Sequence, residues 1–413
     1  MTQLTSYSPS VSADFLAGRV RSIDAARGAA MIFVCLAHFT DSYHFVAGAD
    51  VAGAYLLAIA MLASPTFMLV SGSVTGFLSV TRRSSFPYLR RRLLDRGVFL
   101  LLIGHPVLAS SGWFNGVGLE TTLKRGYITD VIAIAIIVGP ALVAKLLPRW
   151  RLVLAGLLFS LDWVAIFKWT PQSQAVEIFK HYFIGIVDPG AYGINFSAFP
   201  VIPWFALYLV GTVVGERLGS IYLTEGKRQG HIFLARIGLA TAGLGVGAKA
   251  LNIVLKHSAT FPRQHPDAMR LLSSYQKFPP SPTYILFYAG FGLLIVAAVF
   301  EAERRGHFKF LMRQLRQIGE ASLVVYAVQF YVYTVIVRGL RLPYSPLWPI
   351  GFATTIAFLA MSATFWNTYL GNSLLTVGLT GALNRRAARK QLLKSHREEE
   401  LQQVPFRTAA LRG

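Results

Sequence analysis

Residues 21–44 read R-S-I-D-A-A-R-G-A-A-M-I-F-V-C-L-A-H-F-T-D-S-Y-H, an apolar run of helical length with charged and titratable residues at its ends. In a helix, the eleven residues from Arg27 to His38 turn through about 1100°, so both side chains share one face about 16 Å apart. Asp41 lies one turn beyond His38, where side chains three residues apart touch. This pattern predicts a helix with a guanidinium near a membrane surface and an imidazole buried on the same face.

The composition identifies the solvent of this helix. The chain has 413 residues, of which 54% are hydrophobic and only 14% charged, and its mean hydropathy is +0.49. Soluble domains carry about 25% charged residues, so we expect an all-α, polytopic integral membrane protein in the lipid bilayer. The net charge of +21 would suggest nucleic acid in a soluble chain.

The distribution of lysine and arginine explains that charge without nucleic acid. About ten apolar spans have membrane-crossing length, and the second is long enough to break or tilt around Pro65. The tails and the odd-numbered turns hold 29 of the 40 basic residues, which predicts that both termini are cytoplasmic. The spans lie near 28–46, 52–80, 94–112, 127–145, 152–168, 199–216, 234–255, 282–300, 319–338 and 346–370.

We therefore expect one transmembrane domain, residues 21–380, between cytoplasmic tails at 1–20 and 381–413. The first tail carries no cleavable signal, and the second is charged enough to be a solvated helix or a disordered extension. A multi-pass protein of the inner or plasma membrane fits this pattern, as a monomer or a homodimer. The single cysteine, Cys35, excludes an internal disulfide and a cysteine metal cluster, and we predict no metal.

His38 and Asp41 are the candidate catalytic residues. Ionisable groups within a membrane span are functional candidates, and a carboxylate beside an imidazole fixes its tautomer and stabilises the imidazolium, as in base–orienter pairs. The alternative is a neutral histidine that is hydrogen-bonded between helices. Cys35, one turn from His38, is either a thiol nucleophile or a small apolar side chain in the core.

The turn at 81–96, T-R-R-S-S-F-P-Y-L-R-R-R-L-L-D-R, contains more arginine than orientation requires. Guanidinium forks bind phosphates in bidentate fashion, so Arg90 and Arg91 are candidates for an anionic ligand together with Arg27. Anchoring at the cytoplasmic surface and contact with lipid head groups is the alternative. Ser71, in the apolar span before this turn, is a candidate for ligand contact.

Other residues within the spans have simpler interpretations. The pairs Gly72/Gly76 and Gly211/Gly215 are small residues four apart, which favours close packing of helices. Asp162 and Lys249 pair either with each other or with other groups.

The spacing of Arg27 and His38 resembles the arginine–histidine signature of the acyltransferase family 3 superfamily. Five patches are similar to one branch, the bacterial relatives of heparan-α-glucosaminide N-acetyltransferase, and they follow the branch's order. They are R-S-I-D-A-A-R-G (21–28), S-P-T-F-M-L-V-S-G (64–72), F-P-V-I-P-W-F-A-L-Y-L-V-G-T-V-V-G (199–215), K-F-P-P-S-P-T-Y-I-L-F-Y-A-G (277–290) and I-G-E-A-S-L-V-V-Y-A-V-Q (318–329). Gln329 stands where the last motif usually has histidine, and His44 is a loose counterpart of a loop histidine.

The resemblance implies about ten membrane helices and transfer of an acyl group, with acetyl-CoA as the expected donor from the cytoplasm. The acceptor would be a hydroxyl or amine of a saccharide or glycolipid at or across the membrane. Arg27 would contact the CoA phosphates and His38 would be the general base. The predicted separation of about 16 Å is comparable to an extended pantetheine arm, which would place the thioester near His38.

Two alternatives belong to other classes of protein. One is a proton-coupled transporter of a small anion or lipid, with a relay through His38, Asp41, Asp162 and Lys249. The other is a non-catalytic membrane component that binds acyl-CoA or assists another enzyme, an alternative that Gln329, in place of the usual histidine, leaves open.

Overall fold

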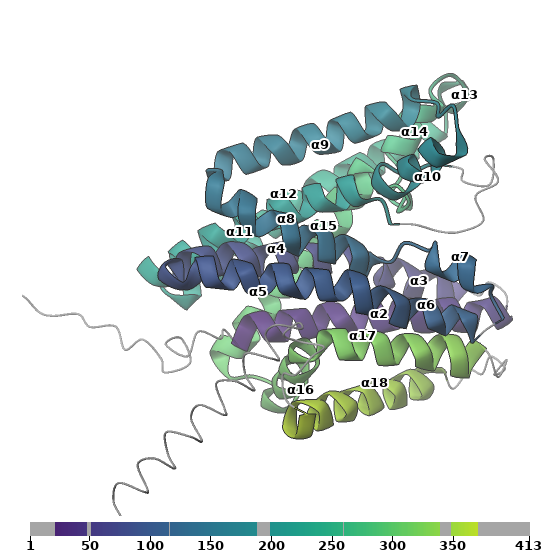
Figure 1. Ribbon diagram of the computed structural model, residues 1–413. Coiled ribbons are helices and arrows are strands. Elements are labelled where there is room, and N and C mark those ends of the chain that lie inside the picture. Colours follow the sequence, from purple (N-terminus) through teal and green to yellow (C-terminus); the bar gives the residue numbers. More distant parts are fainter. Residues whose placement is uncertain are drawn as a thin grey trace, which may run out of the picture.

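The computed structural model describes residues 21–47, 51–114, 116–187, 199–258, 260–338 and 348–370, and the helices in these ranges form one bundle (Figure 1). In the described part, nine helical segments are long and apolar enough to cross a membrane, and no strand occurs. The predicted all-α polytopic fold is confirmed. The orientation of the termini stays a prediction, and both predicted tails, 1–20 and 381–413, lie outside the described residues.

The spanning segments agree closely with the predicted spans. They consist of α2 (Arg21–Ala47), α3 (Val51–Ala60) with α4 (Ala63–Thr81), η1 (Arg83–Ser85) with α5 (Phe86–Phe99), η2 (Leu100–Gly104) and α6 (His105–Trp113), α7 (Leu119–Leu123) with α8 (Ile128–Lys145), α9 (Pro148–Lys168), α11 (Val201–Thr224), α12 (Lys227–Lys256), α15 (Pro282–Arg305), and α18 (Trp348–Phe365) with η5 (Trp366–Leu370).

The predicted span at 319–338 differs from the other nine. It consists of α16 (Lys309–Glu320), α17 (Ser322–Tyr331) and η4 (Val332–Arg338), and the chain bends by 84° between α16 and α17. The run that begins at residue 319 thus crosses the bundle only from α17 onward, and the preceding α16 turns aside.

The expected break near Pro65 lies at Met61 and Leu62, between α3 and α4. Pro65 is the third residue of α4, where its missing N–H removes no bond within α4. Instead, the carbonyl of Met61, four residues earlier, loses its helical donor. The Tyr284 hydroxyl of α15 donates to this carbonyl at 3.0 Å, so a residue from another helix satisfies the break.

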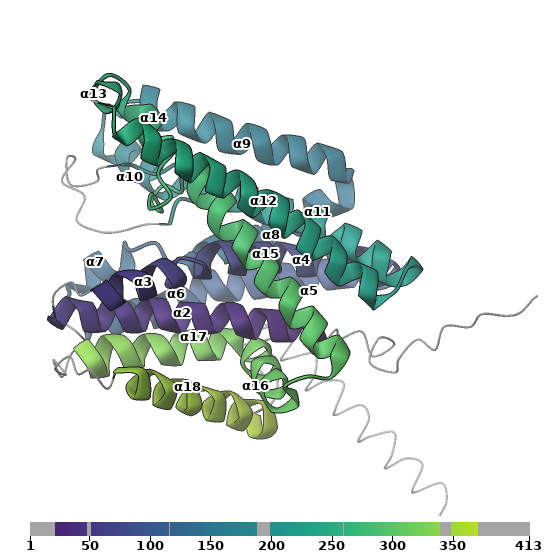
Figure 2. The ribbon, with the colours of Figure 1, turned by 180° about the vertical axis from the view of Figure 1, so that it is seen from behind.

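Helix α9 lies at one edge of the bundle and α18 at the opposite edge, with α4, α8 and α2 between them (Figures 1 and 2). Helix α4 packs along α11, α12 packs along α15, and α2 contacts α4, α16 and α17. Four short helices gather at one end of the bundle: α7, α10 (Gln174–Phe183), α13 (Phe261–Gln264) and α14 (Pro266–Leu271).

Glycines allow the closest contacts between helices. A Cβ atom added to Gly76 would lie 1.8 Å from the carbonyl oxygen of Thr212, and one added to Gly215 would lie 1.9 Å from that of Ser73. The prediction that these glycine pairs serve helix packing is confirmed for α4 and α11. In α2, a Cβ atom at Gly28 would lie 1.9 Å from the Leu315 carbonyl oxygen, so α16 is held against the start of α2.

Candidate active site

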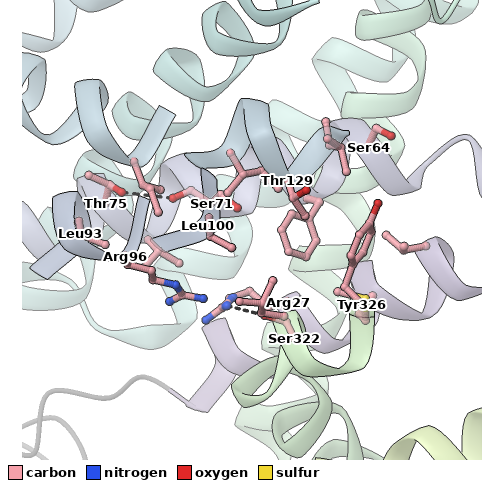
Figure 3. Close-up of a pocket in the computed structure, with 18 residues that line it drawn as sticks. Arg27, Ser64, Ser71, Thr75, Leu93, Arg96, Leu100, Thr129, Ser322 and Tyr326 are labelled. Carbon is pink, nitrogen blue, oxygen red and sulfur yellow. Dashed lines mark hydrogen bonds between the residues drawn. The ribbon is translucent and has the colours of Figure 1, made fainter. Parts of the chain in front are cut away.

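A pocket between α2, α4, α5, α8 and α17 is lined by two of the predicted ligand-binding residues, Arg27 and Ser71 (Figure 3). It contains about 860 Å³ of atom-free space, including its opening, and its lining is largely apolar. An apolar lining with a few polar groups is typical of a small-molecule site. Its polar lining residues are Arg27, Ser64, Ser71, Thr75, Arg96, Thr129, Ser322 and Tyr326.

One end of the pocket is cationic. The guanidinium groups of Arg27 and Arg96 point toward one another (Figure 3). Arg27 donates from Nη2 to the Ser322 hydroxyl at 2.6 Å, and its Nη1 lies 3.9 Å from Oδ1 of Asp24. The Arg96 guanidinium has no hydrogen-bond or ion-pair partner among the described residues. The unpaired charge of Arg96 beside a second guanidinium is one that an anionic ligand would neutralise.

Hydroxyl groups are spaced along the body of the pocket. Ser71 and Thr75 lie on α4, and the Thr75 hydroxyl shares a hydrogen bond of 2.7 Å with the Tyr208 hydroxyl. The Thr129 hydroxyl of α8 is buried and has no partner in the described part of the chain. Its unused hydrogen-bonding capacity is available to a ligand, since a buried hydroxyl is rarely left unpaired.

His38 lies just beyond the pocket. The pocket reaches Val34 and Tyr326, and His38 follows Val34 by one turn of α2. The His38 ring packs edge-on against Tyr326 and Phe330, with ring centroids 6.1 and 5.1 Å apart. Arg27 and His38 thus both contact α17, which confirms that they share a face of α2. The hydrogen bond between His38 and Asp41 stays a prediction.

Asp41 is exposed and attracts a lysine that the sequence did not single out. Lys277, in the loop before α15, holds its ammonium over two aromatic rings, 5.5 Å from the centroid of Phe199 and 5.2 Å from that of Phe278. Burial lowers the pKa of Lys277 to about 8, and the charge of Asp41 opposes this shift. A basic group with an unusual pKa therefore lies near the end of α2 that carries His38.

The structure separates the predicted arginines. Arg27 lines the pocket, whereas Arg90 is half-buried and Arg91 is exposed, and neither belongs to its lining. Arg96 is the second arginine that lines the pocket. The sequence feature that could have identified Arg96 is its position, because it is the last arginine before the apolar run that starts at Gly97.

A histidine–carboxylate pair escaped the sequence analysis. Nδ1 of His105 lies 2.9 Å from Oδ2 of Asp130, and its Nε2 donates to the Leu123 carbonyl at 2.9 Å. Both ring nitrogens are occupied, so His105 joins α6, α7 and α8 rather than presenting a free base. The centroid of the Tyr127 ring lies 5.5 Å from that of His105 and 5.8 Å from that of Phe330. Phe330 in turn contacts His38.

The remaining candidates take structural positions. Cys35 is 1% exposed in the main hydrophobic core and does not line the pocket. Gln329 is fully buried, and its amide has no hydrogen-bond partner among the described residues. The side chain of His44 lies outside the described residues. In the part of the chain that the structure describes, no group of three or more potential ligands could hold a metal ion.

Asp162 and Lys249 do not face each other. Asp162, buried in α9, is attracted by Lys180 of α10. The ammonium of Lys249 lies over the rings of Tyr275 and Phe287, 5.6 and 4.8 Å from their centroids. Asp162 and Lys249 therefore lie in different surroundings, which does not support a proton relay that includes both.

One comparison with known proteins bears on this site. The model of the family described as heparan-alpha-glucosaminide N-acetyltransferase, catalytic, matches residues 19–258, which include α2 to α12. No curated protein matches the chain. The match covers more than half of the chain and includes Arg27, Ser71, Arg96 and His38, whereas α17 lies beyond it.

Proposed function

Because the chain belongs to the heparan-alpha-glucosaminide N-acetyltransferase catalytic family, we propose that it transfers an acetyl group from acetyl-CoA to a glycan. The family makes the chain a multi-pass membrane acetyltransferase. The proposal adds the donor, its binding from the cytoplasm, and an acceptor amine or hydroxyl of a saccharide or glycolipid. It also places the chain in the inner or plasma membrane, within the acyltransferase family 3 superfamily and its bacterial branch.

The facing guanidinium groups of Arg27 and Arg96 carry this proposal. Acetyl-CoA is anionic at its nucleotide end and reactive at its thioester end, and an extended pantetheine arm separates the two. Phosphates bound by Arg27 and Arg96 would direct this arm along the apolar pocket, past Ser71 and toward Tyr326. Arg90 and Arg91, outside the lining, would add a weaker attraction.

The predicted general base lies where the thioester would arrive. His38 follows Arg27 by about 16 Å along α2 and contacts Tyr326, a lining residue. In the proposed step, the nitrogen or oxygen of the acceptor attacks the thioester carbonyl with its lone pair. At the same time, the imidazole of His38 accepts the proton that this nitrogen or oxygen loses. A C–N or C–O bond forms, the C–S bond breaks, and the CoA thiolate takes the proton from the imidazolium. Asp41 would stabilise that imidazolium, and Ser71 would donate to the ligand.

Transfer of labelled acetyl groups by the purified protein tests the proposal. With acetyl-CoA and an amino-sugar acceptor, we expect His38→Gln to reduce turnover by about 100-fold or more, the usual contribution of a general base. The affinity for CoA should be retained, since Arg27 lies three turns away. Asp41→Asn should lower the rate less, because the base remains. His257→Gln, an exposed histidine at the end of α12, is the matched control and should be normal.

Each contrary outcome has a distinct meaning. Normal turnover by His38→Gln would show that His38 is structural and that the base lies elsewhere. Binding of acetyl-CoA by the wild type without transfer to any acceptor would favour the non-catalytic component. Proton-coupled uptake into vesicles would favour the transporter, although the separate engagements of Asp162 and Lys249 do not support its relay.

A further inference from the structure

We propose that the hollow between the end of α15 and α16 binds the phosphoryl head group of an anionic phospholipid. The hollow contains about 780 Å³ of atom-free space, including its open side. It shares no lining residue with the pocket that holds Arg27 and Arg96. Its main lining residues are Glu303, His307, Lys309, Phe310, Arg313 and Arg316.

The hollow has more positive than negative charge. Arg316 lies 3.7 Å from Glu303, so one arginine is balanced by the single acidic residue of the lining. Lys309 and Arg313 have no ion-pair partner in the part of the chain that the structure describes. The Arg313 guanidinium lies over the Phe310 ring at 5.7 Å, which holds its donors in place. Two cations without acidic partners in one hollow favour a phosphate group.

The position of the hollow indicates which phosphate reaches it. The spanning helix α15 ends at Arg305, and the chain then turns through left-handed residues, Gly306 with φ 69° and Phe308 with φ 52°. Helix α16 follows at 84° to α17, so it leaves the direction of the bundle beside the end of α15 (Figure 2). The hollow therefore lies at the level where a spanning segment ends, which is the level of lipid head groups.

Exposed aromatic side chains support a lipid rather than a soluble anion. Phe308 and Phe310 are 71% and 70% exposed beside the basic residues. Phenylalanine side chains beside lysine and arginine are typical of helices that lie in the membrane interface, and a soluble phosphate would gain nothing from the rings. The opposite side of α16 is already occupied, because Leu315 and Gly319 pack against α2. The basic and aromatic side is thus the side of α16 that is left for lipid.

Native mass spectrometry of the purified full chain with added phosphatidylglycerol tests this site. Each basic residue near an anionic surface contributes about 1 kcal/mol, so Lys309→Ala with Arg313→Ala should weaken retention of the lipid by about 30-fold. The control is Lys227→Ala with Arg228→Ala, which removes the same charge from exposed positions at the start of α12. The control should retain the lipid, and phosphatidylcholine should bind weakly to all three proteins.

Three results would overturn the assignment. Equal losses in the two double variants would show that the lipid responds to overall charge and not to this hollow. Equally strong displacement by glycerol 1-phosphate would identify a site for soluble phosphate. Retention that does not fall with rising salt in the wild type would exclude an ionic contact, and this measurement stands even if a variant fails to fold.

Discussion

Replacing Arg96 with alanine is expected to weaken acetyl-CoA binding without weakening the empty protein. Arg96 faces Arg27 across the pocket, and it has no acidic partner among the described residues. Without ligand, the two positive charges repel each other, so the substitution should leave the unfolding temperature of the empty protein unchanged or raise it. With ligand, the substitution would remove the proposed charge-assisted hydrogen bond to phosphate, and such a bond contributes about 1.5–3 kcal/mol.

That loss corresponds to a dissociation constant about 10- to 150-fold higher. At a concentration of acetyl-CoA 100 times the wild-type dissociation constant, the ligand should stabilise the wild type by about 2.7 kcal/mol. A 50-fold loss of affinity would reduce this stabilisation to about 0.7 kcal/mol. Thermal unfolding of the detergent-solubilised protein, with and without acetyl-CoA, measures both quantities.

Matched variants identify the cause of the effect. Arg96→Lys keeps the charge but not the planar fork, so its affinity should be intermediate. Arg91→Ala should have a small effect, and Arg228→Ala, at the exposed start of α12, should have none. An Arg96→Ala protein that unfolds at a lower temperature when empty, yet keeps the wild-type stabilisation by acetyl-CoA, would refute this explanation of the pocket.

Three further predictions concern the bundle and its ends. Gly76→Ala should destabilise the protein by about 1–3 kcal/mol, because its Cβ would meet the Thr212 carbonyl at 1.8 Å, whereas Gly156→Ala, with nothing within 4 Å, should not lower the unfolding temperature. Amine labelling of Lys277 should rise with a midpoint near pH 8, since burial lowers its pKa to about 8. Asp41→Asn should move this midpoint to lower pH, because the Asp41 charge raises the pKa of Lys277. A midpoint near that of ordinary lysines would contradict the effect of burial. Reporters fused in the turn between α4 and α5 should lie in the cytoplasm, and reporters fused between α12 and α15 should lie outside. The reverse arrangement would contradict the proposed binding of acetyl-CoA from the cytoplasm.

The sequence was sufficient for features that depend on one helix and its period. The spacing of Arg27 and His38 predicted their common face, and the spacing of Gly72 and Gly76 predicted close packing. Arg96 was harder to predict, because arginines in one turn differ only by which of them the neighbouring helices enclose. Lys277 lies far from Asp41 in the sequence, so only the folded chain brings them together. The bend before α17 could not be predicted, because the length of an apolar run does not indicate the direction in which the helix runs.

The hydrogen bond between Arg27 and Ser322 joins residues 295 positions apart, and this separation affects when the enzyme can become active during its synthesis. The ribosome delivers Arg27 at the start of the bundle, but the serine that holds its guanidinium arrives only with α17. A nascent chain that has inserted everything through α12 still lacks this serine and the Tyr326 wall. The pocket proposed for acetyl-CoA is therefore completed late in membrane insertion, so unfinished chains should not bind acetyl-CoA there.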